Sequence, residues 1–427
     1  MNPVVRIPYA AAGAVARALA TIAPGGSAKA ARTLRARRAI EDRYANWARQ
    51  NRDPARPLLW VHAPSVGEGL QALPVIKLFR ARHPEAQLAY TFFSPSAETF
   101  AGTVGADFHD YLPFDTAFDA ERSLTALRPS ALVFSKLDVW PVLVESAARK
   151  GVKLGMLSAT LPTSSQRVSA MARLVLGDAY AALDSVGAVS DADALRLIAA
   201  GVAANRITIT GDTRYDQAWQ KAEDSSSSRD ALLAPLRGTR FTMVAGSTWP
   251  SDEERLLPAW QAAKAAHGDV RLVIAPHELS ERHLEAIEAW SRTNHLSTAR
   301  VGDAAASSAD IVVVDRYGIL GDLYALADIA YVGGGFRSAG LHSLLEPAAF
   351  GAPVIIGPRH EDNRDARLLV AAGGAFRCAD AAAIESCIRK LREPESLTRA
   401  RAAAREVVRA GLGAAEQSFA LVEALMP

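Results

Sequence analysis

Two successive series of short apolar runs, separated by helix-like sequence, constrain the fold of this chain more than any other feature. In the first series, runs rich in β-branched and aromatic residues alternate with stretches of helical period, such as 67–82 with its apolar face. Short apolar runs of this kind are typical of strands buried on both faces of a parallel sheet. The expected strands are 58–63, 87–93, 131–134, 153–157, 185–189 and 206–209.

The alternation stops at 222–230, where four consecutive serines indicate a linker, and then restarts. The strands expected in the second series are 241–245, 271–275, 311–314, 329–332 and 353–356. A chain of 427 residues suits two domains of about 200 residues each. We therefore predict an α/β protein of two doubly wound, Rossmann-like domains (1–222 and 231–427, joined by a linker at 223–230), with ligands bound at the carboxyl ends of the strands in an interdomain cleft. The last helical stretch, 397–425, is expected to pack back across the hinge.

The first 50 residues are strongly basic. They hold nine Lys and Arg against two acidic residues, Glu41 and Asp42, whereas the whole chain has a net charge of only +2. The apolar stretch 4–23 is interrupted by Arg6 and Arg17, so it is not a membrane-spanning helix. Two interpretations remain open: a helix lying in an anionic membrane interface, or a basic helix packed on the N-terminal domain. A signal peptide is a third, less favoured one.

The strongest local motif is the turn after the first strand, Ser65-Val66-Gly67-Glu68. A carboxylate in the first turn of a helix stabilises the helix dipole and caps free N–H groups, and this is the purely structural interpretation of Glu68. The functional interpretation is a general base that faces the predicted cleft and removes a proton from an attacking hydroxyl. The helix N-terminus would keep such a carboxylate ionised.

A second motif follows the strand at 329–332. Gly333, Gly334 and Gly335 allow close approach of the backbone to a ligand, and the helix after them favours a phosphate. His342 and Glu346 are expected to face the same pocket, where Glu346 could accept hydrogen bonds from the two hydroxyls of a ribose. The alternative is a tight turn followed by a helix that ends at Glu346-Pro347.

Two further strand ends carry polar groups. Ser247-Thr248 precedes an acidic helix start, so it either caps that helix or offers hydroxyl and N–H groups to a phosphate. Pro276-His277 ends the next strand, and His277 is either a phosphate or base contact or a histidine of the core. No Cys/His spacing suggests zinc, and Asp191-Ala192-Asp193 opens a helix, so we expect neither a metal nor another cofactor. No nucleic acid partner is expected.

Together these elements resemble the 3-deoxy-D-manno-octulosonic acid (Kdo) transferases. The resemblance runs from about residue 32 to residue 376 and follows the same order along the chain. It rests on the turn ending at Glu68, 111–115, Trp140-Pro141, 211–216 with Arg214, Ser247-Thr248 with Glu253-Glu254, Asp315 with Gly318, 333–346, and Gly357-Pro358 followed by Asn363.

The resemblance implies a GT-B fold and an inverting transfer of Kdo, or a similar sugar, from its cytidine monophosphate (CMP) ester to a lipid A-type acceptor. It implies Glu68 as the base and Glu346 as a ligand of the cytidine ribose. Around the donor and acceptor it implies Ser65, Gly67, Asp138, Arg214, Ser247, Thr248, Pro276, His277, Gly333, Gly334, Gly335, His342 and Asn363. It also implies a protein bound at the cytoplasmic face of the inner membrane, peripherally or through its N-terminus.

The sequence departs from the family pattern mostly in the N-terminal half. Lys136 and Asp138 stand where the family usually has two acidic residues, and Thr160 and the Pro276-His277 turn each lack a family arginine. The charge reversal at Lys136 lies near the expected acceptor or donor carboxylate. Two other functions therefore stay open: a GT-B transferase or sugar-nucleotide epimerase for another sugar, and a non-enzymatic homologue that binds lipid or nucleotide.

Overall fold

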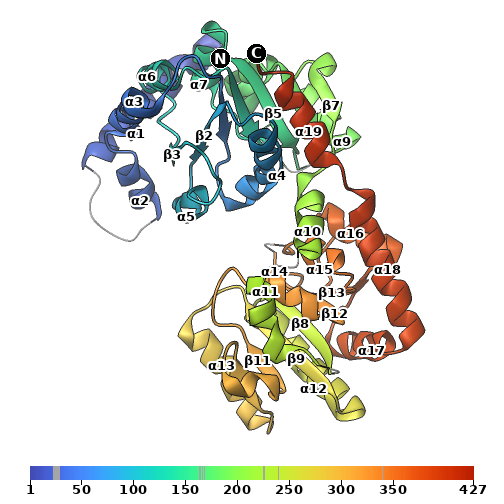
Figure 1. The fold of residues 1–427 in the computed structure, drawn as a ribbon. Coiled ribbons are helices and arrows are strands. Elements are labelled where there is room, and N and C mark those ends of the chain that lie inside the picture. Colours follow the sequence, from blue (N-terminus) through green and yellow to red (C-terminus); the bar gives the residue numbers. More distant parts are fainter. Residues whose placement is uncertain are drawn as a thin grey trace. The chain divides into compact units, whose positions relative to one another are not determined.

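The computed structural model describes residues 1–22, 29–162, 165, 167, 169–224, 227–238, 240–338 and 340–427. It forms two compact units (Figure 1), of which unit 1 comprises Met1–Gln217 with Gly413–Pro427 and unit 2 comprises Ala218–Leu412.

Unit 1 is built on a parallel sheet in the strand order β3-β2-β1-β4-β5-β6-β7. Its strands are β1 (Leu58–His62), β2 (Gln87–Phe92), β3 (Phe108–Tyr111), β4 (Ala131–Ser135), β5 (Lys153–Ala159), β6 (Ser185–Ala188) and β7 (Ile207–Ile209). Strand β1 pairs with both β2 and β4, so the strand order reverses beside it. Ligands of open α/β sheets bind at such a reversal, outside the carboxyl ends of the strands.

Helices cover both faces of this sheet, because its central strands are buried along their whole length. The helices between the strands are α4 (Val66–Arg82), α5 (Glu98–Ala101), α6 (Ala117–Leu127), α7 (Pro141–Arg149), α8 (Ala170–Ala181), α9 (Asp191–Ala200) and the start of α10 (Thr213–Glu223). Trp60 is fully buried in the core, and its indole N–H donates to the Thr91 hydroxyl at 2.9 Å. This bond satisfies the only polar atom of the Trp60 side chain.

Helices α1 (Pro3–Ile22), α2 (Lys29–Ala36) and α3 (Ile40–Asn51) precede the sheet. Helix α1 is attached to unit 1 by polar side chains: Tyr9 donates to Asp115 at 2.7 Å, and Arg17 pairs with Asp119 and Glu41 at 3.2 and 2.6 Å. Of the two main interpretations of this segment, packing on the N-terminal unit is therefore observed, and it leaves a face of α1 open to solvent. No described helix is long and apolar enough to cross a membrane.

Unit 2 repeats the arrangement, with the parallel strand order β10-β11-β9-β8-β12-β13-β14. The strands are β8 (Phe241–Thr248), β9 (Val270–Pro276), β10 (Thr298–Arg300), β11 (Ile311–Val313), β12 (Ile329–Val332), β13 (Val354–Ile356) and β14 (Ala375–Arg377). The helices are α11 (Ser227–Leu233), α12 (Pro250–His267), α13 (Glu281–Thr293), α14 (Leu320–Leu323), α15 (Leu345–Ala349), α16 (Arg364–Ala372), α17 (Ala381–Leu391) and α18 (Pro394–Ala410). Here the order reverses at β8, which pairs with both β9 and β12.

The predicted fold class is confirmed, since both sheets are doubly wound and parallel. The domain bounds differ from the predicted ones. Unit 1 ends inside α10, residues on both sides of the serine run are helical, and residues 225–226 of the run lie outside the described chain. The final helix, α19 (Ala414–Glu423), belongs to unit 1 rather than unit 2, because Phe419 and Val422 are buried in the core of unit 1.

Candidate active site

The carboxyl ends of β1 and β4 bring Glu68 and Lys136 together in unit 1. Glu68 lies in the first turn of α4, and Lys136 directly follows β4. The Lys136 ammonium lies 3.1 Å from Oε1 of Glu68, while the Ser65 hydroxyl donates to Oε2. Ser65 occupies the N-cap position of α4 but makes no cap hydrogen bond to the helix backbone. The Ser65 side chain therefore orients the Glu68 carboxylate instead of capping the helix.

These contacts set the charge of Glu68. Burial raises the pKa of Glu68, but the hydrogen bond from Ser65 and the positive charge of Lys136 lower it by more, so the pKa lies below its usual range. The carboxylate is consequently ionised at neutral pH and can accept a proton. Its side chain keeps 17% of its surface exposed. Gly67 beside it is also exposed, and a Cβ there would meet only the Ser65 hydroxyl, at 3.8 Å.

The backbone at Lys136 is unusual for a lysine. Its φ is 72°, in the left-handed region that L-residues with side chains rarely adopt. Its N–H is held by the carbonyl of Leu157 at 2.7 Å, and the preceding Ser135 donates from its hydroxyl to the carbonyl of Glu68 at 2.8 Å. The turn after β4 is thus tied both to β5 and to the helix that carries Glu68. The charge reversal at Lys136 is visible in the sequence, but this ion pair is not, because it depends on the pairing of β1 with β4.

Asp138, a predicted binding residue, lies in the same turn. It pairs with Arg167 at 2.9 Å, and its other oxygen lies 3.8 Å from Nε2 of the buried His62. Burial raises the pKa of Asp138, but His62 and Arg167 lower it below the usual range. The indole N–H of Trp140 also points at Nε2 of His62, at 3.3 Å. Asp138 is therefore ionised, and its contacts with Arg167 and His62 support the ends of the strands. Contact of Asp138 with a ligand stays a prediction.

Arg214, at the start of α10, is held in a fork on Asp212, with nitrogen–oxygen distances of 2.9 and 2.7 Å. Burial raises the pKa of Asp212, and the charge and hydrogen bonds of Arg214 more than reverse that effect. The pair thus neutralises a buried carboxylate where α10 begins. Ligand binding by Arg214 stays a prediction.

In unit 2, the glycine-rich turn after β12 is anchored by Asp252 in the first turn of α12. Oδ2 of Asp252 accepts from the N–H groups of Gly334 and Trp249, each at 3.0 Å, and Oδ1 accepts from the Tyr331 hydroxyl at 2.9 Å. Gly334 has a φ of 97°. A Cβ on Gly333 would lie 2.2 Å from the carbonyl oxygen of Ser247, and this close packing explains why glycine is needed there. Sequence analysis noted the acidic helix start but not this anchoring role.

Two predicted residues, Ser247 and Thr248, lie at the carboxyl end of β8. Thr248 is buried and donates from its hydroxyl to Glu253 at 2.7 Å, while His283 contacts the same carboxylate at 2.8 Å. Ser247 has a φ of 53°, a left-handed conformation at the switch point of the sheet. Both predicted residues thus lie where the sheet order reverses, and Glu253 and His283 support them.

The rings of Trp249, His277 and His342 form a cluster, in which the ring plane of His277 is tilted by 31° to both neighbours and the Trp249 indole N–H donates to Nε2 of His342 at 3.3 Å. His277 lies 4.5 Å from Trp249 and 4.4 Å from His342, measured between ring centroids, and Arg337 covers the outer face of Trp249 at 3.6 Å. Burial, followed by the nearby His277 and Arg337, lowers the pKa of His342 to about 4, so His342 is neutral at pH 7. His277 is exposed and follows the buried Pro276, which excludes the interpretation of His277 as a core histidine.

The remaining predicted residues lie on neighbouring elements of unit 2. Glu346 lies in the first turn of the short helix α15, half-exposed, and 3.6 Å from the ammonium of Lys221. His342 precedes that helix, and a pocket shared by the two residues stays a prediction. Asn363 is the N-cap of α16 and accepts from the N–H of Ala366 at 3.0 Å. It also lines a cavity of about 470 Å³ with Arg337 and Arg359. Within the described residues there is no cluster of His, Cys, Asp and Glu able to hold a metal ion.

Two doubly wound parallel sheets, one with a carboxylate and the other with a glycine-rich turn at the point where the strand order reverses, define the fold class as GT-B. A solved UDP-N-acetylglucosamine 2-epimerase has the same fold, with a TM-score of 0.62 at 15% identity over 87% of this chain and 95% of that one.

The sequence comparisons go further. A family model described as 3-deoxy-D-manno-octulosonic-acid transferase matches residues 36–217. The 3-deoxy-D-manno-octulosonic acid transferase of Bordetella pertussis is 30% identical over 87% of this chain and 88% of its own, and that of Haemophilus influenzae is 25% identical over 91% and 92%. The chain belongs to the 3-deoxy-D-manno-octulosonic acid transferase family and is a glycosyltransferase, which confirms the resemblance seen in the sequence.

Proposed function

We propose that this protein transfers Kdo, or a closely similar sugar, from its CMP ester to a lipid A-type acceptor in lipopolysaccharide synthesis, with inversion at the anomeric carbon. The family supports the sugar and the reaction class. The single observation that supports the mechanism is Glu68, an ionised carboxylate at the switch point of unit 1, oriented by Ser65 and Lys136 beside the open position of Gly67.

In this mechanism Glu68 accepts the proton of the acceptor hydroxyl. The acceptor oxygen forms the new bond to the anomeric carbon while the bond to the phosphate oxygen breaks, and CMP leaves. A single displacement inverts the anomeric configuration. Lys136 keeps Glu68 ionised before the transfer and can also offset the negative charge of the sugar carboxylate.

The donor is assigned to unit 2. We propose that Ser247, Thr248, His277 and the glycine-rich turn contact the phosphate of CMP, and that Glu346 accepts hydrogen bonds from the ribose hydroxyls. The ring contact between His277 and the neutral His342 supports this assignment, because the N–H of His342 donates to the carbonyl of Gly333 at 3.3 Å and so holds both rings beside the glycine-rich turn. The fixed N–H groups and dipoles of such a turn stabilise charge that develops on a leaving phosphate.

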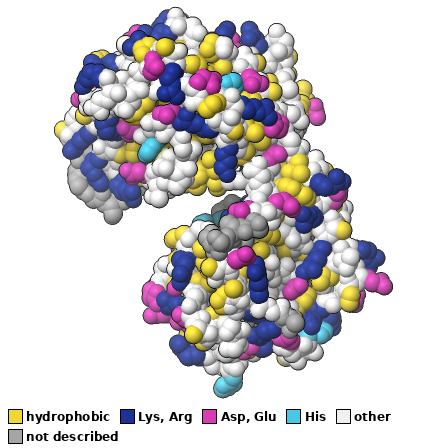
Figure 2. Space-filling view, viewed as in Figure 1, with side chains coloured by type: hydrophobic (Ala, Val, Ile, Leu, Met, Phe, Trp, Pro, Cys, Tyr) yellow, Lys and Arg dark blue, Asp and Glu magenta, His cyan; other side chains and the backbone are white. Residues whose placement is uncertain are grey.

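The acceptor is lipid-linked, so we also propose that the enzyme acts at the cytoplasmic face of the inner membrane. Helix α1 supports this proposal, because Val4, Ile7 and Ile22 expose 81%, 79% and 73% of their surface. Figure 2 shows Lys and Arg side chains on the face of unit 1 over α1 to α3. Apolar side chains beside basic ones are typical of helices that lie in an anionic membrane surface.

A transfer assay tests the proposed function. The protein is mixed with CMP-Kdo, with and without a phosphorylated, acylated glucosamine disaccharide. Release of CMP that requires the acceptor, together with a product of inverted anomeric configuration by NMR, supports the proposal. Release of nucleotide without an acceptor, or turnover of a uridine diphosphate sugar alone, would point to an epimerase-like reaction instead.

A further inference from the structure

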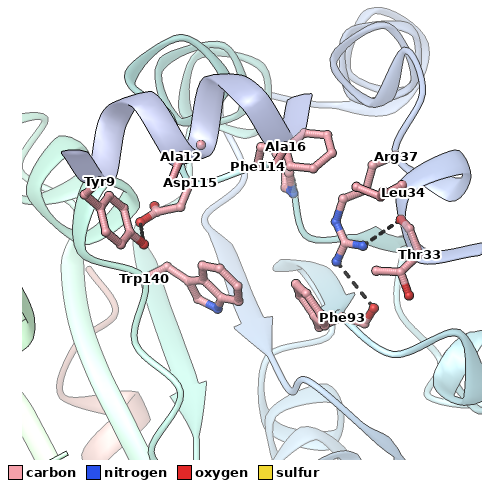
Figure 3. Close-up of a pocket in the computed structure, with 12 residues that line it drawn as sticks. Tyr9, Ala12, Ala16, Thr33, Leu34, Arg37, Phe93, Phe114, Asp115 and Trp140 are labelled. Carbon is pink, nitrogen blue, oxygen red and sulfur yellow. Dashed lines mark hydrogen bonds between the residues drawn. The ribbon is translucent and has the colours of Figure 1, made fainter. Parts of the chain in front are cut away.

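A cavity of about 310 Å³ lies beneath α1, between that helix and the carboxyl ends of the strands of unit 1 (Figure 3). Its walls are mostly apolar and come from separate parts of the chain: Ala12 and Ala16 of α1, Leu34 of α2, and the rings of Phe93, Phe114 and Trp140. This volume is at the lower end of the range of about 300–1,000 Å³ typical of small-molecule sites. Protein interiors are close-packed, so an apolar space of this size needs an explanation.

The two charged groups of the cavity differ in their partners. Asp115 accepts from Tyr9 at 2.7 Å and from the N–H groups of Val142 and Leu143 at 3.1 and 2.8 Å, so its hydrogen-bonding capacity is used. In Figure 3 this group lies across the cavity from Arg37. An anionic ligand would avoid the Asp115 side.

Arg37 has hydrogen-bond partners on the backbone but no opposite charge paired with it among the described residues. It is only 3% exposed, and its guanidinium donates to the backbone carbonyls of Leu112, Thr33 and Phe93 at 2.8, 2.9 and 3.3 Å. It lies over the Phe93 ring at 4.2 Å, but it forms no ion pair with any carboxylate in the described part of the chain. Burial lowers the pKa of Arg37 to about 10, which leaves it protonated at neutral pH. A buried positive charge without a carboxylate favours an anionic ligand.

The cavity adjoins the turn that carries Glu68. Phe93 in its wall donates from its N–H to the carbonyl of Pro64 at 3.0 Å, and Trp140 donates to His62 at 3.3 Å. The Phe93 and Trp140 rings stack with centroids 5.4 Å apart. His62 ends β1, and Pro64 belongs to the short connection between β1 and the helix of Glu68. The wall of the cavity is thus hydrogen-bonded to the connection that leads to the helix of the proposed base.

We propose that this cavity binds a hydrocarbon chain of the acceptor, with a negatively charged group of the same molecule directed to Arg37. The inference rests on the proposed function, and it adds a site that would select acylated, anionic acceptors. The cavity is too small for a whole lipid, so it takes part of one chain, and the sugar extends toward Glu68.

Calorimetric binding tests this proposal without any sugar transfer. The probes, used below their critical micelle concentrations, are decyl phosphate, octyl phosphate, decyl maltoside with its neutral head, and inorganic phosphate. We expect decyl phosphate to bind best and octyl phosphate to bind roughly fifteenfold more weakly, because each buried methylene changes affinity about fourfold. Decyl maltoside should bind more weakly than decyl phosphate, and inorganic phosphate should not bind measurably.

Two variants of α1 show where the chain binds. Ala16→Phe places a ring in the cavity, whereas Ala14→Phe adds the same ring at an exposed position of α1 outside it. Ala16→Phe should weaken decyl phosphate binding at least tenfold, and Ala14→Phe should leave it unchanged. Equal binding by both variants would overturn the proposal.

The transfer assay separates this inference from the proposed function. The unmodified protein should prefer an acylated disaccharide phosphate to its deacylated form, and Ala16→Phe should largely abolish that preference while Ala14→Phe retains it. If transfer is absent with both acceptors, the proposed function fails, whereas the calorimetric result on the cavity still stands. If transfer occurs but the preference is the same in both variants, the cavity is not the chain-binding site.

Discussion

Replacing Asp252 by alanine should loosen the glycine-rich turn of unit 2 and destabilise that unit. The carboxylate is fully buried and accepts hydrogen bonds from Gly334, Trp249 and Tyr331. In Asp252→Ala all of these donors lose their acceptor. A buried donor left unsatisfied costs about 1–3 kcal/mol, so the loss should amount to roughly 3 kcal/mol or more. For a unit of this size that corresponds to a fall in Tm of about 6–12 °C.

Differential scanning calorimetry measures this effect, and two matched variants make it specific. Asp252→Asn keeps an oxygen for the two N–H groups, and the Tyr331 hydroxyl can turn to accept from the new amide, so the loss should stay below about 1.5 kcal/mol. Glu254→Ala removes a carboxylate from the same turn whose side chain is 72% exposed, and should change stability by less than about 0.5 kcal/mol.

The same variants should differ in nucleotide binding. Because Asp252 holds the N–H of Gly334 in place, Asp252→Ala should bind CMP more weakly than Asp252→Asn in a calorimetric titration at 15 °C, where both variants are folded. The reasoning would be refuted if Asp252→Ala lost no more stability than Glu254→Ala, since three buried donors would then have found other acceptors at no cost.

Two further predictions concern the base and the membrane. In Lys136→Met the positive charge beside Glu68 is lost, so the pKa of Glu68 should rise. The acidic limb of the kcat/KM–pH profile should therefore move to higher pH. An unchanged limb, or one moved to lower pH, would contradict the pairing of Lys136 with Glu68. In Val4→Ser/Ile7→Ser the exposed apolar face of α1 is lost, so co-sedimentation with anionic vesicles should weaken roughly tenfold or more. The control variant Leu195→Ser, at a 69% exposed position of α9, should not alter co-sedimentation. Equal binding by the double variant and the control would exclude α1 as the membrane contact.

Much of the fold could be predicted because its signal is local. Buried central strands are continuous apolar runs, and these were found in both units. The strands that were missed, β3, β10 and β14, all lie at sheet edges. Strand β3 shows the reason: its middle residues His109 and Asp110 are exposed or half-buried, so no apolar run marks it. The last helical stretch was expected to pack back across the hinge, and its final part, α19, does belong to unit 1, whereas α18 belongs to unit 2.

The candidate site likewise contains some residues with a local sequence signal and others without one. Glu68 and the glycine-rich turn carry their signal in a few consecutive residues. The groups that set their properties are far away in sequence: Lys136 is brought to Glu68 by the pairing of β1 with β4, and Tyr331 is brought to Asp252 by the pairing of β8 with β12. Contacts of this kind depend on strand order and register, and a single sequence does not contain them in readable form.

The measurement that tests the account most directly is sugar transfer by Glu68→Gln, which keeps the shape and the hydrogen bond from Ser65 but cannot accept the proton. With CMP-Kdo and the acylated disaccharide acceptor, the account predicts that kcat falls about 10²–10⁴-fold while the affinity for CMP, measured by calorimetry, stays within about twofold. A Glu68→Gln enzyme that transfers the sugar at the unmodified rate would contradict the assignment of Glu68 as the base.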